Sequence, residues 1–295
     1  MALAAVPLLF VVAPASQAGA VTIPAKVPSN VAVTDTQPLS YQGPSLVSNP
    51  TDPSDLAISY QEGAQEQNCY LALSNNGGRT WRDEALIGPQ GQFPLPSGYI
   101  ACLRMSDLYA PDGTLYYAFT ASMAAASGPH PTTIFLTSST NNGATFSTPV
   151  PIDTKPLAQP ANVGDQEPRM AVDPNSGKLY VTWQQVVGKF ASEAVLVASS
   201  TNKGQTFSNP VQISTAAQTT VGLETVAVDS AGRVYVDFSV SLAGGPVAPA
   251  LSNLVEVAYS TDGGQTFNLG VAMNTAICLS GCPTGLGTPL GFDGP

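Results

Sequence analysis

Residues 74–81 read SNNGGRTW, and three later stretches follow the same pattern: SSTNNGATF (138–146), SSTNKGQTF (199–207) and YSTDGGQTF (259–267). All four fit Ser-x-Asn/Asp-x-Gly-x-Thr-aromatic, and their serines are 65, 61 and 60 residues apart. Five matched positions that recur at a near-constant period indicate an internal structural repeat. The matched residues are Ser74, Asn76, Gly78, Thr80, Trp81; Ser139, Asn141, Gly143, Thr145, Phe146; Ser200, Asn202, Gly204, Thr206, Phe207; Ser260, Asp262, Gly264, Thr266 and Phe267.

Short runs of β-forming residues flank each copy. In the third unit, runs 169–172 and 178–183 surround the turn DPNSG, run 194–199 leads into the motif, and run 211–214 follows it. No segment has a 3.6-residue apolar period over a helix-like length. Four strands in each unit of about 60 residues predict an all-β fold, a β-propeller of four-stranded blades.

The motif itself is predicted to be the hairpin turn between the third and fourth strands of each blade. Serine and Asn/Asp side chains hydrogen-bond nearby backbone groups in such turns. Glycine supplies the positive φ that a tight turn needs. We expect the aromatic residue to anchor the turn in the apolar interior, so the motif needs no ligand.

The composition excludes several function classes. Of the 295 residues, 10% are charged and 43% are apolar, so the chain can bury a core of one large domain or two ordinary ones. The net charge is −10 and the sequence holds no basic cluster, which excludes nucleic acid as the expected partner. An acidic surface also disfavours binding to anionic membranes.

The N-terminus, MALAAVPLLFVVAPASQAGA, is typical of a secretory signal peptide. An apolar stretch precedes Ala18-Gly19-Ala20, so we expect residues 1–20 to be cleaved and the protein to be secreted or extracytoplasmic. No Lys or Arg precedes the apolar stretch, which departs from the usual pattern. No later segment reaches the roughly 18 apolar residues of a membrane span.

The four cysteines suggest disulfides, because an even number is usual in secreted chains. Three pairings are possible, and proximity in sequence favours Cys69–Cys102 and Cys278–Cys282. A zinc site is disfavoured because the one histidine, His130, is far from every cysteine. No cofactor is expected. Calcium at Asp52 and Asp55 is the remaining metal candidate, although their spacing matches no calcium loop.

The four motifs resemble the Asp boxes, or BNR repeats, of the sialidase superfamily, over roughly residues 41–270. The resemblance implies a β-propeller with the boxes at the blade periphery, and places four blade repeats in residues 41–275. Residues 21–40 form an N-terminal segment in which 29–36 is a candidate closing strand, and 276–295 begin a further blade or form a tail. A sialidase propeller has six blades, so a truncated chain and an open or divergent propeller are both alternatives.

Sialidase-like catalysis implies three arginines that hold a sugar carboxylate, a tyrosine nucleophile activated by a glutamate, and an aspartate acid/base. Gln42 stands where the family's first arginine is expected. Arg104 and Arg169 lie in the first runs of their units, which line the central channel of a propeller. Tyr116, Tyr180 and Tyr235 recur on second strands and are interpreted as core, so no catalytic tyrosine is identified.

The candidate site residues follow from these positions. Arg104, Arg169 and Glu167 are candidate ligand-binding residues, and Glu224 and Asp165 are candidate catalytic residues. The alternative is that the arginines pair with local carboxylates such as Asp107, Asp165 or Glu167, and that Glu224 is an exposed charge at a strand edge.

Two function hypotheses remain open. The first is a secreted, sialidase-like exo-glycosidase that acts on sialylated or related glycans. The second is a non-catalytic secreted propeller that binds a glycan or a protein through its channel face. Gln42 and the missing tyrosine favour the second hypothesis, and the four motifs favour the first as a family assignment.

Overall fold

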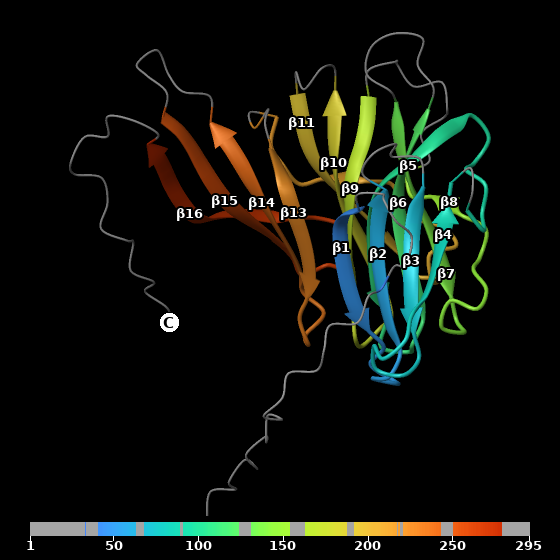
Figure 1. The fold of residues 1–295 in the computed structure, drawn as a ribbon. Helices are drawn as coiled ribbons and strands as arrows, with labels where there is room; N and C mark the ends of the chain where they lie inside the picture. The colour runs from blue at the N-terminus through green and yellow to red at the C-terminus, as the bar shows by residue number, and fades with distance from the viewer. Residues whose placement is uncertain are drawn as a thin grey trace, which may run out of the picture. The chain divides into compact units, whose positions relative to one another are not determined.

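The structure is a computed structural model, and it describes residues 33, 41–62, 68–88, 91–123, 131–153, 163–187, 192–216, 218, 221–242 and 250–278. These residues form an all-β fold of sixteen strands (Figure 1). Within this part of the chain, no helix is long and apolar enough to cross a membrane. The predicted signal peptide, the segment 29–36 apart from residue 33, His130 and Cys282 lie outside the described residues.

The strands form four consecutive antiparallel units, and within each unit the strands pair in the order in which they occur in the chain. The strands are β1 (Tyr41–Ser48), β2 (Leu56–Glu62), β3 (Cys69–Ser74), β4 (Arg82–Ile87); β5 (Tyr99–Tyr109), β6 (Leu115–Met123), β7 (Thr132–Ser139), β8 (Val150–Pro151); β9 (Val163–Val172), β10 (Leu179–Val187), β11 (Ser192–Ser200), β12 (Val211–Gln212); β13 (Val221–Val228), β14 (Val234–Leu242), β15 (Ala250–Ser260) and β16 (Asn268–Cys278).

The second and third units are joined into one hydrogen-bonded sheet. A single parallel pair, Thr132 with Gly164, links β7 to β9, whereas the first and fourth units are separate four-stranded sheets. The first strands of neighbouring units contact one another, β1 with β5, β5 with β9, and β9 with β13. Side chains at equivalent positions of neighbouring first strands can therefore contact one another.

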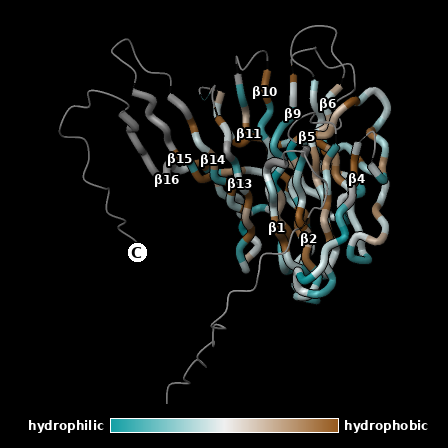
Figure 2. Tube along the Cα trace, viewed as in Figure 1, coloured by the Kyte–Doolittle hydropathy of each residue, from teal (hydrophilic) through white to brown (hydrophobic). Residues whose placement is uncertain are grey.

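Three apolar clusters fill the spaces between successive units. Side chains alternate along each strand, so neighbouring residues belong to different clusters. In β6, Tyr117 and Phe119 belong to the cluster with the first unit, and Tyr116 and Ala118 to the cluster with the third. In β11, Val195 and Val197 pack toward the fourth unit. Figure 2 shows hydrophobic residues along these strands and hydrophilic residues in the turns below β1–β4. Each fully buried apolar side chain contributes about 1.5–3 kcal/mol.

In each of the four motif turns, the serine is buried and its side chain hydrogen-bonds the backbone of the turn. Its Oγ accepts the N–H of the motif glycine at 2.8 or 2.9 Å. The Asn or Asp Oδ1 accepts the N–H of the motif threonine at 2.9 or 3.0 Å. The aromatic residues are half-buried, and the three phenylalanines pack at the edges of the apolar clusters rather than within them.

The motif glycines also join neighbouring units. A Cβ added at Gly143 would lie 2.2 Å from Leu73 Cδ1, and one added at Gly204 would lie 2.2 Å from Leu136 Cδ2. Leu73 and Leu136 belong to the preceding unit in each case. A hydrogen bond also joins the first unit to the second motif turn: Arg82 Nη2 donates to the carbonyl of Gly143 at 2.8 Å. The second, third and fourth motif turns therefore each contact the unit before them.

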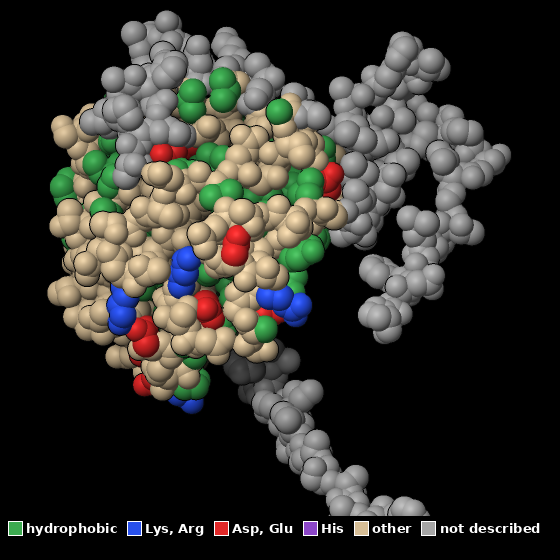
Figure 3. Space-filling view, turned by 180° about the vertical axis from the view of Figure 1, so that it is seen from behind, with side chains coloured by type: hydrophobic (Ala, Val, Ile, Leu, Met, Phe, Trp, Pro, Cys, Tyr) green, Lys and Arg blue, Asp and Glu red, His purple; other side chains and the backbone are tan. Residues whose placement is uncertain are grey.

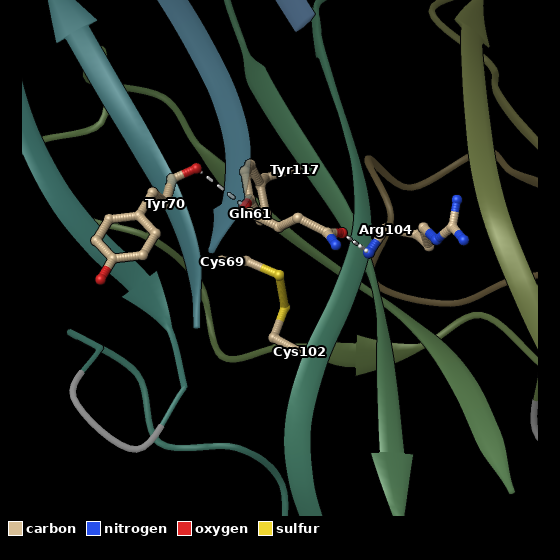
Figure 4. Close-up of a disulfide and its surroundings, with 6 residues drawn as sticks. All are labelled: Gln61, Cys69, Tyr70, Cys102, Arg104 and Tyr117. Carbon is tan, nitrogen blue, oxygen red and sulfur yellow. Dashed lines mark hydrogen bonds between the residues drawn. A yellow bond between two sulfur atoms is a disulfide. The ribbon is translucent and has the colours of Figure 1, made fainter. Parts of the chain in front are cut away.

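A disulfide between Cys69 in β3 and Cys102 in β5 crosses from the first unit to the second (Figure 4). The predicted pairing of these two cysteines is confirmed. The side chain of Cys278 is not described, so the second predicted pair stays a prediction.

Candidate functional site

A β-bulge interrupts the first strand of every unit at the same height. The register shifts lie between Gln42 and Ser45 in β1, Leu103 and Met105 in β5, and Gly222 and Thr225 in β13. The matching shift in the β9–β10 ladder lies between Thr182 and Gln184 of β10. Bulges redirect side chains away from the regular alternation of a strand. A buried aromatic of the second strand lies beside each bulge: Tyr60, Phe119, Trp183 and Phe238.

Three of the bulged positions have left-handed backbone. The φ angles are 59° at Gly43, 40° at Arg104 and 56° at Glu167. Glycine adopts this conformation readily, but for Arg104 and Glu167 it is unfavourable by about 1–3 kcal/mol. Such strain persists only where the surrounding structure imposes it, and it concentrates at functional sites.

The bulges of β1, β5 and β9 surround a pocket of about 400 Å³. Its size is typical of small-molecule sites, which measure about 300–1,000 Å³. The lining residues are Gly43, Pro44, Ser45, Gln61, Arg104, Met105, Ser106, Glu167 and Arg169. We call this the arginine pocket. It contains all three residues that the sequence indicated as ligand-binding.

Arg104 is held in the pocket by two contacts with different units. Its Nη1 lies 2.7 Å from Glu167 Oε1, in an ion pair between the second and third units. Its backbone N–H donates to Oε1 of the buried Gln61 at 2.8 Å, a bond to the first unit that Figure 4 shows beside the disulfide. Arg104 therefore pairs with Glu167 and not with Asp107, the neighbour in sequence.

Arg169 is less fully engaged. Its Nη1 donates to the carbonyl of Pro168 at 3.1 Å, and no ion pair of Arg169 occurs among the described residues. The half-buried guanidinium of Arg169 therefore has most of its five N–H donors available to a ligand. An anionic group is the partner that such a cation binds most strongly.

Glu224 lies beside these residues and is buried, not exposed at a strand edge as the alternative interpretation had it. Its side chain is 1% exposed, and neither carboxylate oxygen makes a hydrogen bond of good geometry with the described residues. Burial, with a smaller contribution from the charge of Glu167, raises the pKa of Glu224 to about 8, and nearby backbone N–H groups and Arg169 only partly oppose this. Glu224 is therefore protonated at neutral pH, although it does not itself line the pocket.

Asp165 has a supporting position. Its Oδ1 accepts hydrogen bonds from Trp183 Nε1 at 3.0 Å and from Gln185 Nε2 at 2.8 Å. Asp165 is buried and does not line the arginine pocket. It fixes the tryptophan that lies beside the bulge carrying Glu167, so the structure does not bring Asp165 together with the arginines.

Gln61 and Asp107 were missed as parts of the site. Gln61 follows the aromatic residue of the second strand, and no sequence signal marks it, because the bulge beside it depends on strand register. Asp107 is buried behind the pocket-lining Ser45 and Ser106, and its Oδ1 accepts from Ser59 Oγ at 2.9 Å. Burial raises the pKa of Asp107 to about 6, and hydrogen bonds from Ser45 and Ser59 oppose that shift.

No tyrosine with a resolved pKa shift is a nucleophile candidate within the described chain. Tyr116 and Tyr180 are buried core residues, and burial raises the pKa of Tyr116 to about 12 and also raises that of Tyr180. The third recurring tyrosine, Tyr235, is half-buried, and its hydroxyl lies 3.3 Å from Asp229 Oδ2. A sialidase nucleophile would need an activating base that lowers its pKa.

The described residues contain no group of three or more His, Cys, Asp or Glu side chains placed to hold a metal ion. The calcium candidates take part in local hydrogen bonds, since Asp52 Oδ1 accepts from the N–H of Ser54 and Asp55 Oδ2 accepts from Asn49 Nδ2. On the face that Figure 3 shows, the charged side chains of both signs are scattered and interspersed.

The fold resembles that of several solved proteins. A protein of unknown function from Dyadobacter fermentans matches with a TM-score of 0.57 at 13% identity, over 82% of this chain and 67% of that one. An α-L-arabinanase from Penicillium chrysogenum, solved with arabinobiose, matches at 0.56 and 17% identity, over 77% and 65%. A GH93 α-L-arabinofuranosidase from Fusarium graminearum, also with arabinobiose, matches at 0.55 and 16%, over 78% and 67%.

The chain thus spans about two thirds of the length of these structures. No family model and no curated protein matches the sequence. The likeness concerns the fold alone: this chain has the all-β architecture of β-propeller enzymes that act on carbohydrates.

Proposed function

We propose that this chain is a secreted, carbohydrate-active propeller of four Asp-box blades that binds an acidic sugar in the arginine pocket. The observation that carries the proposal is the convergence of Arg104, Glu167 and Arg169, from two strands, on one pocket with the protonated Glu224 beside it. Structural neighbours that act on or bind arabinan-type sugars support a glycan as the ligand. The disulfide supports an oxidising compartment.

The Asp-box assignment is supported by the four motif turns and their repeated hydrogen bonds. On this proposal the chain is related to the sialidase superfamily, whose sugar substrates carry a carboxylate. Arg169 is the first candidate to hold that carboxylate, since a guanidinium forms two parallel hydrogen bonds with it. Arg104 would contribute its remaining donors, because Glu167 already occupies one of them.

Glu224 is the candidate proton donor. A carboxylic acid that is neutral at pH 7 can protonate the glycosidic oxygen as the bond to the anomeric carbon breaks. Water then adds to that carbon, and Glu167 is the lining carboxylate that can accept the water proton. Asp165 is proposed to position Trp183 and the Glu167 bulge rather than to exchange protons.

A non-catalytic binding function is the second candidate, and the burial of Glu224 favours it. A carboxyl group that is 1% exposed cannot reach a sugar unless the β13 bulge moves. Binding to the arginines needs no such movement. The ligand could then be the acidic glycan of a larger partner.

Titration calorimetry with galacturonate and galactose tests the binding step, because these sugars differ by one carboxylate. We expect galacturonate alone to bind, and Arg169→Gln to weaken it about tenfold or more. Arg233→Gln is the control, because Arg233 is exposed and pairs with Asp229. Equal binding of the two sugars, or unchanged binding by Arg169→Gln, would contradict an acidic-sugar site.

Fluorogenic sialosides, uronides and arabinofuranosides then separate the two candidates. Turnover that Glu224→Gln abolishes while galacturonate binding persists supports the enzyme. Binding without turnover of any of the three supports the non-catalytic propeller.

A further inference from the structure

We infer that a second site, for a neutral saccharide, lies in the groove between the first two motif turns. This groove measures about 400 Å³ and is lined by Trp81, Asn75, Thr80 and Arg82 of the first unit and by Asn141 and Asn142 of the second, among others. We call it the tryptophan groove. It is separate from the arginine pocket and does not depend on the function proposed for that pocket.

The groove and the pocket lie toward different parts of β5 and share no lining residue. Tyr109, at the end of β5, donates its hydroxyl hydrogen to Asn142 in the groove. Arg104, in the pocket, is five residues earlier in β5, which corresponds to about 17 Å along an extended strand. A ligand in one site therefore leaves the other open.

Trp81 supplies the stacking surface. The other three motifs carry phenylalanine at this position. The indole Nε1 donates to the carbonyl of Gly78 at 3.1 Å, so the ring is held on its own turn while it lines the groove. Its polar atom is thus satisfied within the protein. The remaining apolar surface of a half-buried indole suits the C–H face of a sugar ring.

Two amide side chains supply polar contacts for sugar hydroxyls. The Oδ1 of Asn142 accepts from Tyr109, which fixes the side chain and leaves its Nδ2 without a partner among the described residues. Asn142 is also held at a φ of 51°. Asn75 is exposed and makes no hydrogen bond within the described chain. Amides both donate and accept, as hydroxyl groups require.

The ligand is expected to be neutral, because the lining holds no acidic side chain and one arginine. Arg82 already donates to the carbonyl of Gly143. The equivalent groove between the second and third turns offers an internal comparison. Its described lining has Ser138, Thr140, Ser147 and Lys203 but no aromatic side chain, so it lacks a stacking surface.

Iodide quenching of tryptophan fluorescence tests the site directly, because the other tryptophan, Trp183, is fully buried. Maltohexaose, cellohexaose and arabinohexaose are the probes, each at about 10 mM, where a site with a Kd near 1 mM is mostly filled. At least one probe is expected to protect Trp81 from iodide in a saturable manner. Failure of all three to protect it overturns the inference.

Calorimetry with the protective probe then locates the binding. Trp81→Phe restores the residue of the sister turns and is expected to weaken binding about three- to tenfold, as is Asn142→Gly, which keeps the left-handed backbone. Lys203→Gly, the same change in the third turn, is the matched control, and Arg169→Gln should leave this binding unchanged. If both groove variants bind like the wild type, the saccharide lies elsewhere and the inference is wrong.

Discussion

Arg104 and Glu167 are 63 residues apart in sequence, yet their side chains meet at 2.7 Å because both occupy the bulge of a first strand. The two bulges lie on β5 and β9, which contact each other. A cation and an anion at equivalent positions of neighbouring repeats thus form one pair across the repeat boundary. This pair defines one wall of the arginine pocket.

The first prediction is that this pair matters for ligand binding and little for stability. Arg104 is 56% exposed, and exposed ion pairs contribute about 0–1 kcal/mol. Glu167→Gln should therefore lower the free energy of unfolding by less than about 1 kcal/mol in urea titrations. It should tighten galacturonate binding, because Arg104 gains a free donor. Weaker binding would mean that Glu167 itself holds the ligand.

The second prediction concerns pH. The pKa of Glu224 is about 8 in the folded protein and near 4.5 when unfolded. Between these values the folded state keeps a proton that the unfolded state has released, so stability falls as pH rises through this window. The loss is at most about 5 kcal/mol. Glu224→Gln should remove this slope and exceed the wild type in stability above pH 8.

Asp107→Asn is the matched comparison for that experiment. The pKa of Asp107 is about 6 when folded and 3.8 ordinarily, so its slope should lie at lower pH. Urea titrations across pH 4–9 distinguish the two windows. A Glu224→Gln variant that keeps the wild-type slope between pH 6 and 8 would show that another group titrates there.

The third prediction is that the Cys69–Cys102 disulfide stabilises the chain by about 3–4 kcal/mol, since it closes a loop of 33 residues. Thermal melts with and without reductant should differ for the wild type. The double variant Cys69→Ser/Cys102→Ser should melt at the lower temperature in both conditions. A reductant-dependent shift that survives in the double variant would point to other cysteines.

Sequence reasoning could find the repeats because the motif and the alternating strands recur along the chain. It could also place Arg104 and Arg169 on first strands, since each lies in the first β-forming run of its unit, before the turn. It could not find the bulges, because register depends on pairing with a neighbouring strand and leaves no mark in the apolar pattern. The ion pair and the burial of Glu224 follow from those bulges and were invisible for the same reason.

Asp165 shows a second limit. In sequence it is one more carboxylate near Glu167, and both were predicted as site residues. Its two hydrogen bonds to β10 come from Trp183 and Gln185, and the buried indole N–H of Trp183 needs an acceptor. Packing between strands decides that Glu167 lines the pocket and that Asp165 supports the core.

The last prediction separates the two reasons for glycine in the motif turns. Gly204 and Gly177 have similar positive φ angles, 79° and 70°. A Cβ at Gly177 meets nothing within 4 Å, whereas one at Gly204 would overlap Leu136 of the preceding unit. Gly177→Ala should therefore cost about 1–2 kcal/mol from backbone strain alone. Gly204→Ala should cost roughly 1–3 kcal/mol more, because the leucine and the turn must move apart.

Urea titrations of both variants measure this difference, and Gly204→Ala/Leu136→Ala tests its cause. Shortening the leucine removes the overlap but leaves a cavity, so the double variant should be more stable than the sum of the single changes predicts. Additive effects would mean that the motif glycine serves its own turn only. A clear coupling between residues of different units would identify the motif as the contact that sets the spacing of the repeats.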